Sequence, residues 1–206
     1  MNDLKRVLLA VVVAVSFAVL IRVFVIEAYR IPSTSMKPTL EPGDTVFVYK
    51  WGFGSTKASQ VPNLGTVIVY NSPKEPAKDY IKRLIAKGGD RVDLKRGEIY
   101  INGNSIKLSG KSGLCHEEVI GQIKFDGCWD PPILKDFGPI IIEKDHYFVI
   151  GDSRSESVIP WEIILPQAIR GIAWRVWISV EPTDPMGAPE SWFSRFRFER
   201  MLKRVE

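Results

Sequence analysis

Two serines lie in a short stretch whose backbone is restrained on both sides. In residues 31–40, Ser33 and Ser35 fall between Pro32 and Pro38. Proline fixes its φ at about −65°, so the chain on either side of the two hydroxyls has little freedom. A serine on such a turn can be held out as a nucleophile. The alternative is a stiff linker whose serines only form turns.

A nucleophilic serine needs a base that takes its proton, and three residues are candidates. Two are the histidines, His116 and His146, and the third is Lys82 in the apolar run 80–85. An ordinary lysine has a pKa of about 10.4, so only about one lysine in 2,500 is neutral at pH 7. Burial among apolar neighbours would lower this pKa. The alternative for Lys82 is an exposed position on an amphipathic strand.

The histidines and cysteines give little material for a metal site. A closed zinc site would need Cys115, His116, Cys128 and His146 together, and adjacent residues such as Cys115 and His116 are poor shared ligands. We therefore expect no metal and no other cofactor.

The composition indicates a folded domain rather than a disordered chain. The 206 residues are 45 % hydrophobic and 25 % charged, which is enough apolar material for a core. A net charge of +4 does not indicate nucleic-acid binding, because such proteins concentrate basic charge on one face. We expect no nucleic-acid partner.

The N-terminal segment has the composition of a membrane anchor. Residues 7–21 contain Ser16 as the only polar residue, and the apolar run extends to Ile26 if Arg22 is allowed. Roughly 20 residues span a bilayer core. A cleaved signal peptide is the alternative, but no small-x-small site follows the apolar run. We predict that residues 1–28 form a cytoplasmic N-terminus and one transmembrane helix.

The rest of the chain, residues 29–206, is predicted to be mostly antiparallel β. Short β-branched and aromatic runs at 45–49, 65–70, 80–85 and 146–150 are bounded by Gly, Pro and Asp. Glu98–Ile101 followed by Asn102 and Gly103 predicts a hairpin with a type I′ turn. Residues 103–140 are expected to form an inserted lobe with long loops, and residues 191–206 a basic, aromatic C-terminal segment.

Four blocks in this order resemble type I signal peptidases. The blocks are Ile31-Pro32-Ser33-Thr34-Ser35-Met36-x-Pro38-Thr39-Leu40, then Pro42-Gly43-Asp44, then Tyr80-Ile81-Lys82-Arg83 with Gly89-Asp90, and then Gly151-Asp152-Ser153-Arg154. The resemblance implies an antiparallel β-rich catalytic domain behind one N-terminal transmembrane helix. It also implies a serine endopeptidase that uses a lysine as its base, a variant of the triad mechanism.

The resemblance assigns roles to several residues. Ser35 would be the nucleophile and Lys82 the general base. The side chain of Ser33 and the backbone N–H of Ser35 would form the oxyanion hole. A further serine, at Ser157 or else at Ser155, would orient the lysine.

The implied substrates are exported pre-proteins whose signal peptides end in a small-x-small site. Such a peptide would lie extended along the chain, with main-chain pairing for affinity and small pockets for selection. The residues implied to bind it are Ile31, Pro32, Met36, Leu40, Asp79, Tyr80 and Ile81.

The sequence departs from the family pattern after Ser157. The family carries an Asp-Ser-Arg triplet two residues on, an ion pair beside the site, whereas this chain reads Val158-Ile159-Pro160-Trp161. Ile159 and Trp161 could replace that pair with apolar contacts, because such a replacement can be neutral or stabilising. A change in substrate or a loss of activity therefore stays open. The alternatives are a pilus or conjugation maturation peptidase with the same dyad, and a catalytically impaired, membrane-anchored paralogue that binds exported chains.

The expected location follows from the implied substrates. Charge does not decide the orientation, since Lys5 and Arg6 precede the apolar run and Arg22, Arg30 and Lys37 follow it. A peptidase that meets signal peptides after export must place residues 29–206 on the outer face of the cytoplasmic membrane, with the N-terminus inside.

The C-terminal segment suits a membrane surface, where its rings would enter the interface and its cations would meet lipid phosphates. The alternative is an ordinary terminal helix that packs on the domain. The residues concerned are Trp192, Phe193, Phe196 and Phe198 with Arg195, Arg197, Arg200, Lys203 and Arg204.

An outer location also permits a disulfide between Cys115 and Cys128, because compartments outside the cytoplasm are oxidising. Closing a loop of about 14 residues stabilises a fold by roughly 3 kcal/mol in the loop-entropy model. Two buried free thiols are the alternative.

Overall fold

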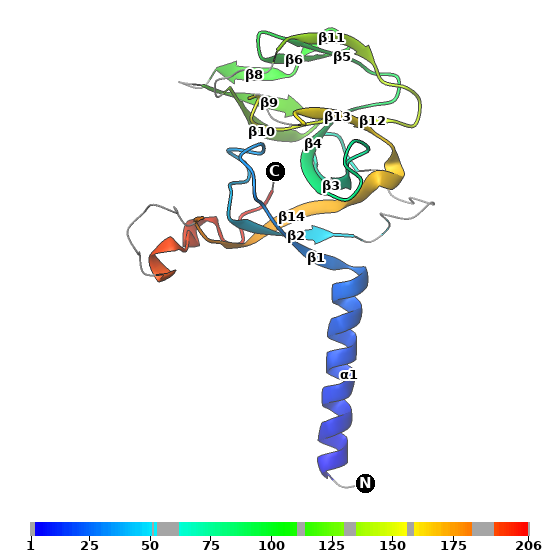
Figure 1. Ribbon diagram of the computed structural model, residues 1–206, viewed down its shortest axis with the longest axis vertical. Helices are drawn as coiled ribbons and strands as arrows, with labels where there is room; N and C mark the ends of the chain where they lie inside the picture. The colour runs from blue at the N-terminus through cyan, green and yellow to red at the C-terminus, as the bar shows by residue number, and fades with distance from the viewer. Residues whose placement is uncertain are drawn as a thin grey trace.

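The computed structural model describes residues 3–50, 52, 62–110, 114–129, 135–155, 159–182 and 192–205. A single long helix, α1 (Asp3–Phe24), stands away from a β-rich body like a stalk (Figure 1). It runs almost directly into the first strand, β1 (Ile26–Arg30).

The predicted transmembrane helix is not confirmed. Among the residues that the structure describes, no helix is both long enough and apolar enough to cross a membrane. The first turns of α1 contain Asp3, Lys5 and Arg6, and the uncharged run that follows is the fifteen residues 7–21.

The body is built on a seven-stranded antiparallel sheet. Its strand order is β1-β2-β14-β3-β4-β12-β13. The predicted runs 45–49, 65–70, 80–85 and 146–150 fall in β2, β3, β4 and β12, so these strand predictions are confirmed. Besides β1, the strands are β2 (Asp44–Tyr49), β3 (Val67–Asn71), β4 (Asp79–Lys87), β12 (Tyr147–Ile150), β13 (Trp161–Ile164) and β14 (Ile169–Ser179).

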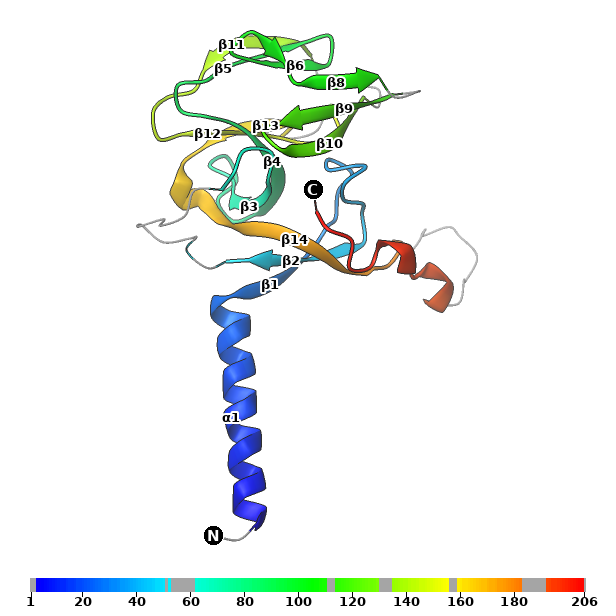
Figure 2. The ribbon, with the colours of Figure 1, turned by 180° about the vertical axis from the view of Figure 1, so that it is seen from behind.

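Two smaller sheets lie at the end of the body that is far from α1 (Figure 2). One has the order β11-β5-β6-β7 and the other the order β10-β9-β8. Their strands are β5 (Arg91–Lys95), β6 (Glu98–Ile101), β7 (Asn104–Ser105), β8 (Lys107–Gly110), β9 (Cys115–Ile120), β10 (Ile123–Cys128) and β11 (Phe137–Ile141). The long loops predicted for residues 103–140 are thus largely strands, because the short runs here pair with one another across tight turns.

The predicted hairpin between β6 and β7 is confirmed. Asn102 and Gly103 have φ angles of 53° and 83°, as both central positions of a type I′ turn require. The turn sets the register in which Ile101 faces Asn104.

Three short 3-10 turns complete the described elements. They are η1 (Pro166–Ala168), η2 (Trp192–Arg195) and η3 (Phe198–Arg200). The terminal helix considered for residues 191–206 is therefore not seen in the described part of that segment.

The apolar core has three buried clusters. One lies between the large sheet and the smaller sheets, with Leu94 and Phe148 among its members. A second lies under the loop that joins β1 to β2 and contains Met36 and Leu40. The third lies along β3, β4, β12 and β13 and contains Leu84. Lys82 lies on β4, so its position is set by this sheet.

Candidate active site

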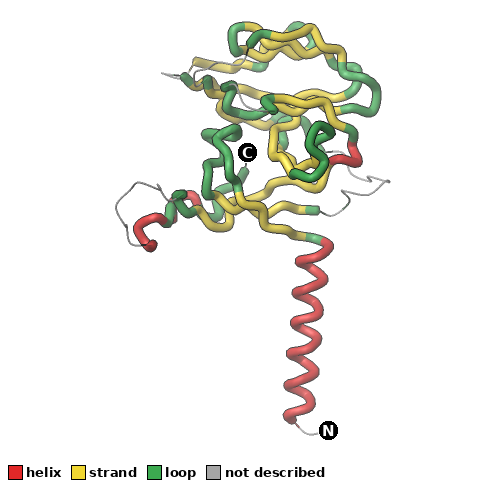
Figure 3. The backbone as a smooth tube through the Cα atoms, viewed as in Figure 1, coloured by secondary structure: helices red, strands yellow, loops and turns green. Residues whose placement is uncertain are grey.

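The loop that carries the serines, residues 31–43, leaves the large sheet and returns to it (Figure 3). Its base is closed by two hydrogen bonds, from Ile31 N–H to Asp44 O at 2.7 Å and from Gly43 N–H to Ile31 O at 2.9 Å. Near its tip, Lys37 N–H donates to Thr34 O at 3.0 Å. The prolines and these bonds together fix the backbone around the serines.

Ser33 and Ser35 point their hydroxyls toward the same place. Their Oγ atoms are 3.2 Å apart. The backbone of Ser35 is also held from the other side, because its carbonyl accepts a hydrogen bond from Ser153 N–H at 3.1 Å. This loop therefore contacts the segment that follows β12.

Lys82 is buried in the middle of the sheet, with 2 % of its surface exposed. Burial lowers the pKa of Lys82 to about 8, because a charged amine loses its hydration there. The carboxylates of Asp152 and Glu162 act in the opposite direction, and the guanidinium of Arg154 adds to the lowering. The exposed position considered for Lys82 is wrong. No described residue forms an ion pair with its amine.

Gly151 lies next to both Ser35 and Lys82. A Cβ atom placed on Gly151 would lie 2.4 Å from the carbonyl oxygen of Ser35 and 3.2 Å from Nζ of Lys82. The Ser35 carbonyl and the Lys82 amine thus lie next to the same glycine, although the two residues are 47 positions apart in the sequence. Sequence analysis did not single out this glycine for that role.

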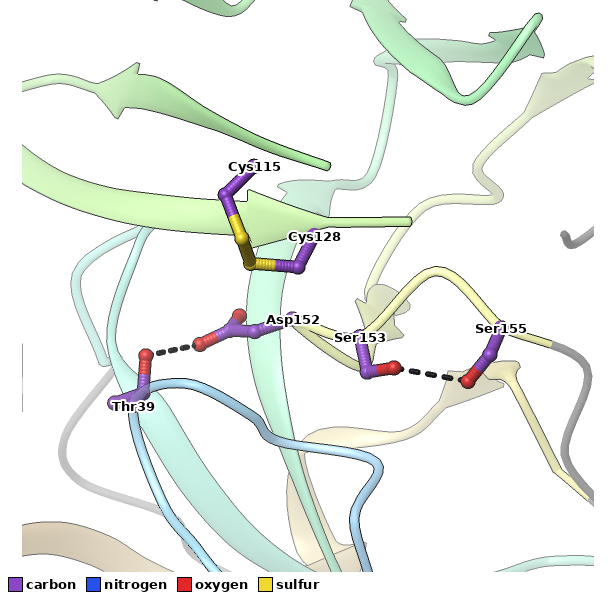
Figure 4. Close-up of a disulfide and its surroundings, with 6 residues drawn as sticks. All are labelled: Thr39, Cys115, Cys128, Asp152, Ser153 and Ser155. Atoms are coloured by element: carbon purple, nitrogen blue, oxygen red, sulfur yellow. Dashed lines mark hydrogen bonds between the residues drawn. A yellow bond between two sulfur atoms is a disulfide. The ribbon is translucent and has the colours of Figure 1, made fainter. Parts of the chain in front are cut away.

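The serine proposed to orient the lysine cannot be placed. Ser157 lies outside the residues that the structure describes. Ser155, the second choice, is described, and its hydroxyl lies 2.8 Å from that of Ser153 (Figure 4).

A buried ion pair next to the site connects the segments that form it. Arg83 donates from Nε and Nη2 to the two carboxylate oxygens of Asp152 at 2.7 and 2.6 Å. Thr39 of the serine loop donates to the same carboxylate at 2.5 Å (Figure 4). The ring of Phe125 lies 4.0 Å from the guanidinium carbon of Arg83. The network ties the loop to β4 and to the end of β12. The blocks quoted above contain Thr39, Arg83 and Asp152, but nothing in the sequence indicated that they bind one another.

A second buried pair links the small sheets to the site. Arg154 binds the carboxylate of Glu118 on β9, and it also donates to the carbonyl oxygen of Gly151. Both side chains are almost completely buried. Burial raises the pKa of Glu118, although the neighbouring guanidinium opposes this.

Cys115 and Cys128 are joined by a disulfide, which lies beside Asp152 and Ser153 (Figure 4). Cys128 N–H donates to Asp152 O at 2.9 Å, and Arg154 N–H donates to Cys128 O at 2.6 Å. The disulfide is thus in direct backbone contact with residues 152–154. As disulfide partners, the two cysteines cannot serve as zinc thiolates.

The histidines lie elsewhere. The His116 ring packs on Trp129 with ring centroids 4.4 Å apart. His146 lies just before β12, and its ring contacts the carbonyl oxygen of Lys144. No hydrogen bond joins either histidine to Ser35 in the described part of the chain. Of the three candidate bases, only Lys82 is brought to the serine loop.

The residues expected to bind substrate fall into two groups. Ile31, Met36 and Leu40 are buried in one core cluster, against which Ile81 packs from β4. Pro32 and Asp79 are exposed, and Tyr80 and Ile81 are half-buried. Ile31, Met36 and Leu40 therefore pack in the core beneath the loop and do not form an open surface.

The segment after the site is packed with apolar side chains. Ile159 is 4 % exposed. The Trp161 ring stacks on Phe148 and contacts Phe137, with ring centroids 5.5 and 4.9 Å apart.

The C-terminal segment binds residues at the C-terminal end of the serine loop, close to its base. Arg197 donates to Glu41 at 2.8 Å, and Arg200 donates to Asp44 at 2.6 Å. Burial alone would raise the pKa of Asp44, but hydrogen bonds from Arg200, the backbone N–H of Glu41 and Ser179 lower it below its ordinary value. We call Arg197, Arg200, Glu41 and Asp44 the arginine clamp. Two of the cations expected to meet lipid thus bind carboxylates of the protein; the side chain of Trp192 lies outside the described part.

The arrangement can support nucleophilic attack by a serine with a lysine as proton acceptor. A β-rich domain with a restrained serine loop next to a buried lysine is an arrangement that suits the class of serine hydrolases.

Comparison with known proteins identifies the family. The model of the family described as "Signal peptidase, peptidase S26" matches residues 4–158. A protein named signal peptidase I P from Bacillus subtilis subsp. natto is 38 % identical over 149 residues, which cover 72 % of this chain and 73 % of that protein. Signal peptidase I from Pseudomonas aeruginosa is 34 % identical over 203 residues, covering 80 % and 69 %.

A crystal structure of a signal peptidase I from Enterococcus faecalis aligns with a TM-score of 0.38 at 20 % identity, covering 55 % of this chain and 97 % of that one. The chain belongs to the signal peptidase family, peptidase S26. It is a serine endopeptidase of the signal peptidase I type.

Proposed function

We propose that this protein removes signal peptides from exported pre-proteins, with Ser35 as the nucleophile and Lys82 as the general base. Family membership supports the substrate class. The observation that supports the dyad is that the carbonyl of Ser35 and the amine of Lys82 both lie next to Gly151.

In this mechanism the neutral amine of Lys82 takes the proton from Ser35 as Oγ attacks the scissile carbonyl carbon. The resulting ammonium then returns the proton to the leaving amine of the mature protein. The Ser33 hydroxyl, whose oxygen is 3.2 Å from that of Ser35, and the Ser35 N–H donate to the oxyanion. One such donor contributes about 2.7–4 kcal/mol in other serine hydrolases. Water activated by the same lysine hydrolyses the acyl-enzyme.

The substrate lies extended between residues 31–33 and 79–81. Pro32 and Asp79 are exposed along this path, and Tyr80 and Ile81 are half-buried. The buried Met36 and Leu40 limit the depth of any pocket under the peptide, which favours small side chains.

Replacement of either member of the dyad tests the mechanism. We expect Ser35→Ala and Lys82→Ala each to abolish cleavage of a model pre-protein by the detergent-solubilised enzyme, with an unchanged far-UV spectrum. His146→Ala is the control and should keep most activity. Cleavage by Lys82→Ala at the wild-type rate would exclude the proposed base. A folded wild-type protein that binds the pre-protein without cutting it would favour the impaired paralogue.

The lowered pKa of Lys82 predicts a pH dependence. Only the neutral amine can accept a proton, so kcat/KM should rise with pH and level off above an apparent pKa near 8. A profile controlled by a histidine would instead level off above about 6.5. Steady-state cleavage rates between pH 6 and 10 distinguish the two.

We further propose that α1 attaches the protein to the cytoplasmic membrane, with the N-terminus inside and residues 29–206 on the outer face. Large apolar side chains of α1 from Leu4 to Val19 are 53–80 % exposed, which favours a lipid environment. Lysine and arginine can extend their charged ends to the interface, which lengthens a short apolar run.

Carbonate extraction of membranes tests this attachment. The full chain should stay with the membrane pellet, and a chain that begins at Val25 should be released into the supernatant. Release of the full chain would exclude α1 as an anchor.

A further inference from the structure

The buried charges around Lys82 differ in whether a nearby charge neutralises them. Asp152 shares both carboxylate oxygens with Arg83, and Arg154 is paired with Glu118. Each of these pairs is electrically neutral as a unit, so its field at Lys82 is reduced.

Glu162 on β13 is the exception. It is 2 % exposed, and it forms no ion pair within the described part of the chain. Its two oxygens accept hydrogen bonds from neutral groups, Oε2 from the Tyr70 hydroxyl at 2.8 Å and Oε1 from the Ser72 hydroxyl at 2.7 Å. Donated hydrogen bonds stabilise a carboxylate without cancelling its charge.

The register of the sheet places Glu162 on the same face as Lys82. Glu162 faces Val149 on β12, and Val149 faces Leu84 on β4. Lys82 is two residues before Leu84, and side chains two apart on a strand share a face. On the other side, Tyr70 faces Tyr80, which also shares this face. Tyr70 therefore crosses the same face of the sheet to reach Glu162.

We propose that Glu162 is the counter-ion of Lys82, a positioning residue that stabilises the ammonium formed when the lysine takes the proton of Ser35. This inference rests on the proposed function. In the step, the Oγ–H bond of Ser35 breaks and an N–H bond forms at Lys82, while Glu162 neither gains nor loses a proton.

The electrostatics agree with this geometry. Burial alone favours the neutral amine, and the carboxylates of Asp152 and Glu162 raise the pKa of Lys82 against it. Asp152 has the larger effect of the two carboxylates, but Arg83 binds both of its oxygens, so its removal would leave a buried cation unpaired. Glu162 is the carboxylate whose charge can be removed without breaking an ion pair of the described residues. The pKa of Tyr70 is raised by burial and by its bond to Glu162, so its hydroxyl remains a donor throughout the working range.

The first test is the pH profile of the Glu162→Gln variant. The charge of Glu162 raises the pKa of Lys82, so its removal should move the apparent pKa of kcat/KM to lower pH. The plateau rate should also fall, since a weaker base accepts the proton less readily. Glu162→Asp keeps the charge, so its apparent pKa should stay close to that of the wild-type enzyme.

Asp93→Asn is the matched control, because Asp93 is also a buried carboxylate but lies in the sheet of β5 and does not contribute to the pKa of Lys82. It should leave the apparent pKa unchanged. A Glu162→Gln variant that loses rate at every pH without a shift would show a merely structural role and overturn the proposal.

A second test does not depend on activity. In the Ser35→Ala background, the pKa of Lys82 can be read from the pH titration of its 13Cε resonance, assigned by its absence in Lys82→Met. Glu162→Gln should lower this midpoint. If that variant does not fold, Glu162→Met, which also removes the charge, should lower it as well. An unchanged midpoint in a folded variant overturns the role of Glu162, whereas cleavage by Lys82→Ala would overturn the proposed function instead.

Discussion

Gly151 is important for the site because it has no side chain. Its backbone lies so close to Ser35 and Lys82 that a single methyl group would collide with the serine carbonyl. The collision involves backbone atoms, which cannot rotate away as a flexible side chain can. At the scale of the residue, the spacing of the proposed dyad depends on this empty space.

Gly151→Ala should therefore move the serine loop away from Lys82. The added Cβ would lie 2.4 Å from the Ser35 carbonyl oxygen, so the loop must shift. We expect cleavage to fall by at least about 100-fold, since small misplacements of reacting groups cost about this much. Gly121→Ala is a control of the same chemistry, because a Cβ there meets nothing within 4 Å, although its positive φ adds some strain. Near-normal cleavage by a folded Gly151→Ala enzyme would contradict the arrangement.

Ser35 and Lys82 were candidates from sequence because their types are unusual in their surroundings, and the resemblance to signal peptidases assigned them the roles of the proposed dyad. A serine pair between prolines and a lysine in an apolar strand both stand out locally. Glu162 and Glu118 do not, because their partners Ser72 and Arg154 lie 90 and 36 residues away, and no local pattern reveals that these segments meet.

At the scale of the element, strands were easier to predict than their arrangement. Period and turn residues gave β2, β4 and the β6–β7 hairpin, since these signals are local. The order β3-β4-β12-β13 joins strands separated by about 60 residues, and it depends on packing of both faces. Strands β9 and β10 lie in residues 103–140, for which long loops are predicted because Gly, Ser, Lys and Pro are frequent in that stretch.

The connection between β12 and β13 carries a prediction at this scale. Ile159 is 4 % exposed, so Ile159→Asp would bury a carboxylate without a partner. We expect a loss of several kcal/mol in the free energy of unfolding, with little change in the chemical step for the folded fraction. Thermal melts and cleavage assays of the same preparation measure both.

Ile141→Asp is the control for that substitution, because Ile141 on β11 is 72 % exposed. A hydrated carboxylate there should change stability by no more than about 0.5 kcal/mol. A similarly small effect of Ile159→Asp would show that this connection is not packed, and it would weaken the case for Ser157 as a partner of Lys82.

At the scale of the whole molecule, the disulfide joins the small sheets to the site. Cys128 exchanges backbone hydrogen bonds with Asp152 and Arg154, so the bond restrains the segment that holds Gly151. The β9–β10 hairpin is therefore connected to residues 152–154, which in turn contact the serine loop through the hydrogen bond from Ser153 to Ser35.

Mass spectrometry without reduction should find the peptides of Cys115 and Cys128 joined in protein purified from membranes. Cys115→Ser should lower the free energy of unfolding by roughly 3 kcal/mol, as expected for a closed loop of about 14 residues. Two thiols that alkylate without reductant would contradict both the bond and the outward placement of residues 29–206.

The arginine clamp has a consequence for the order in which the protein is made. Asp44 and Arg200 lie 156 positions apart, so the cations that hold the serine loop are synthesised long after Ser35 and Lys82. A nascent chain that has not reached Arg197 carries both groups of the proposed dyad without the clamp. We therefore expect proteolytic competence to appear only after translation has passed these arginines, so that the emerging chain is protected from its own chemistry.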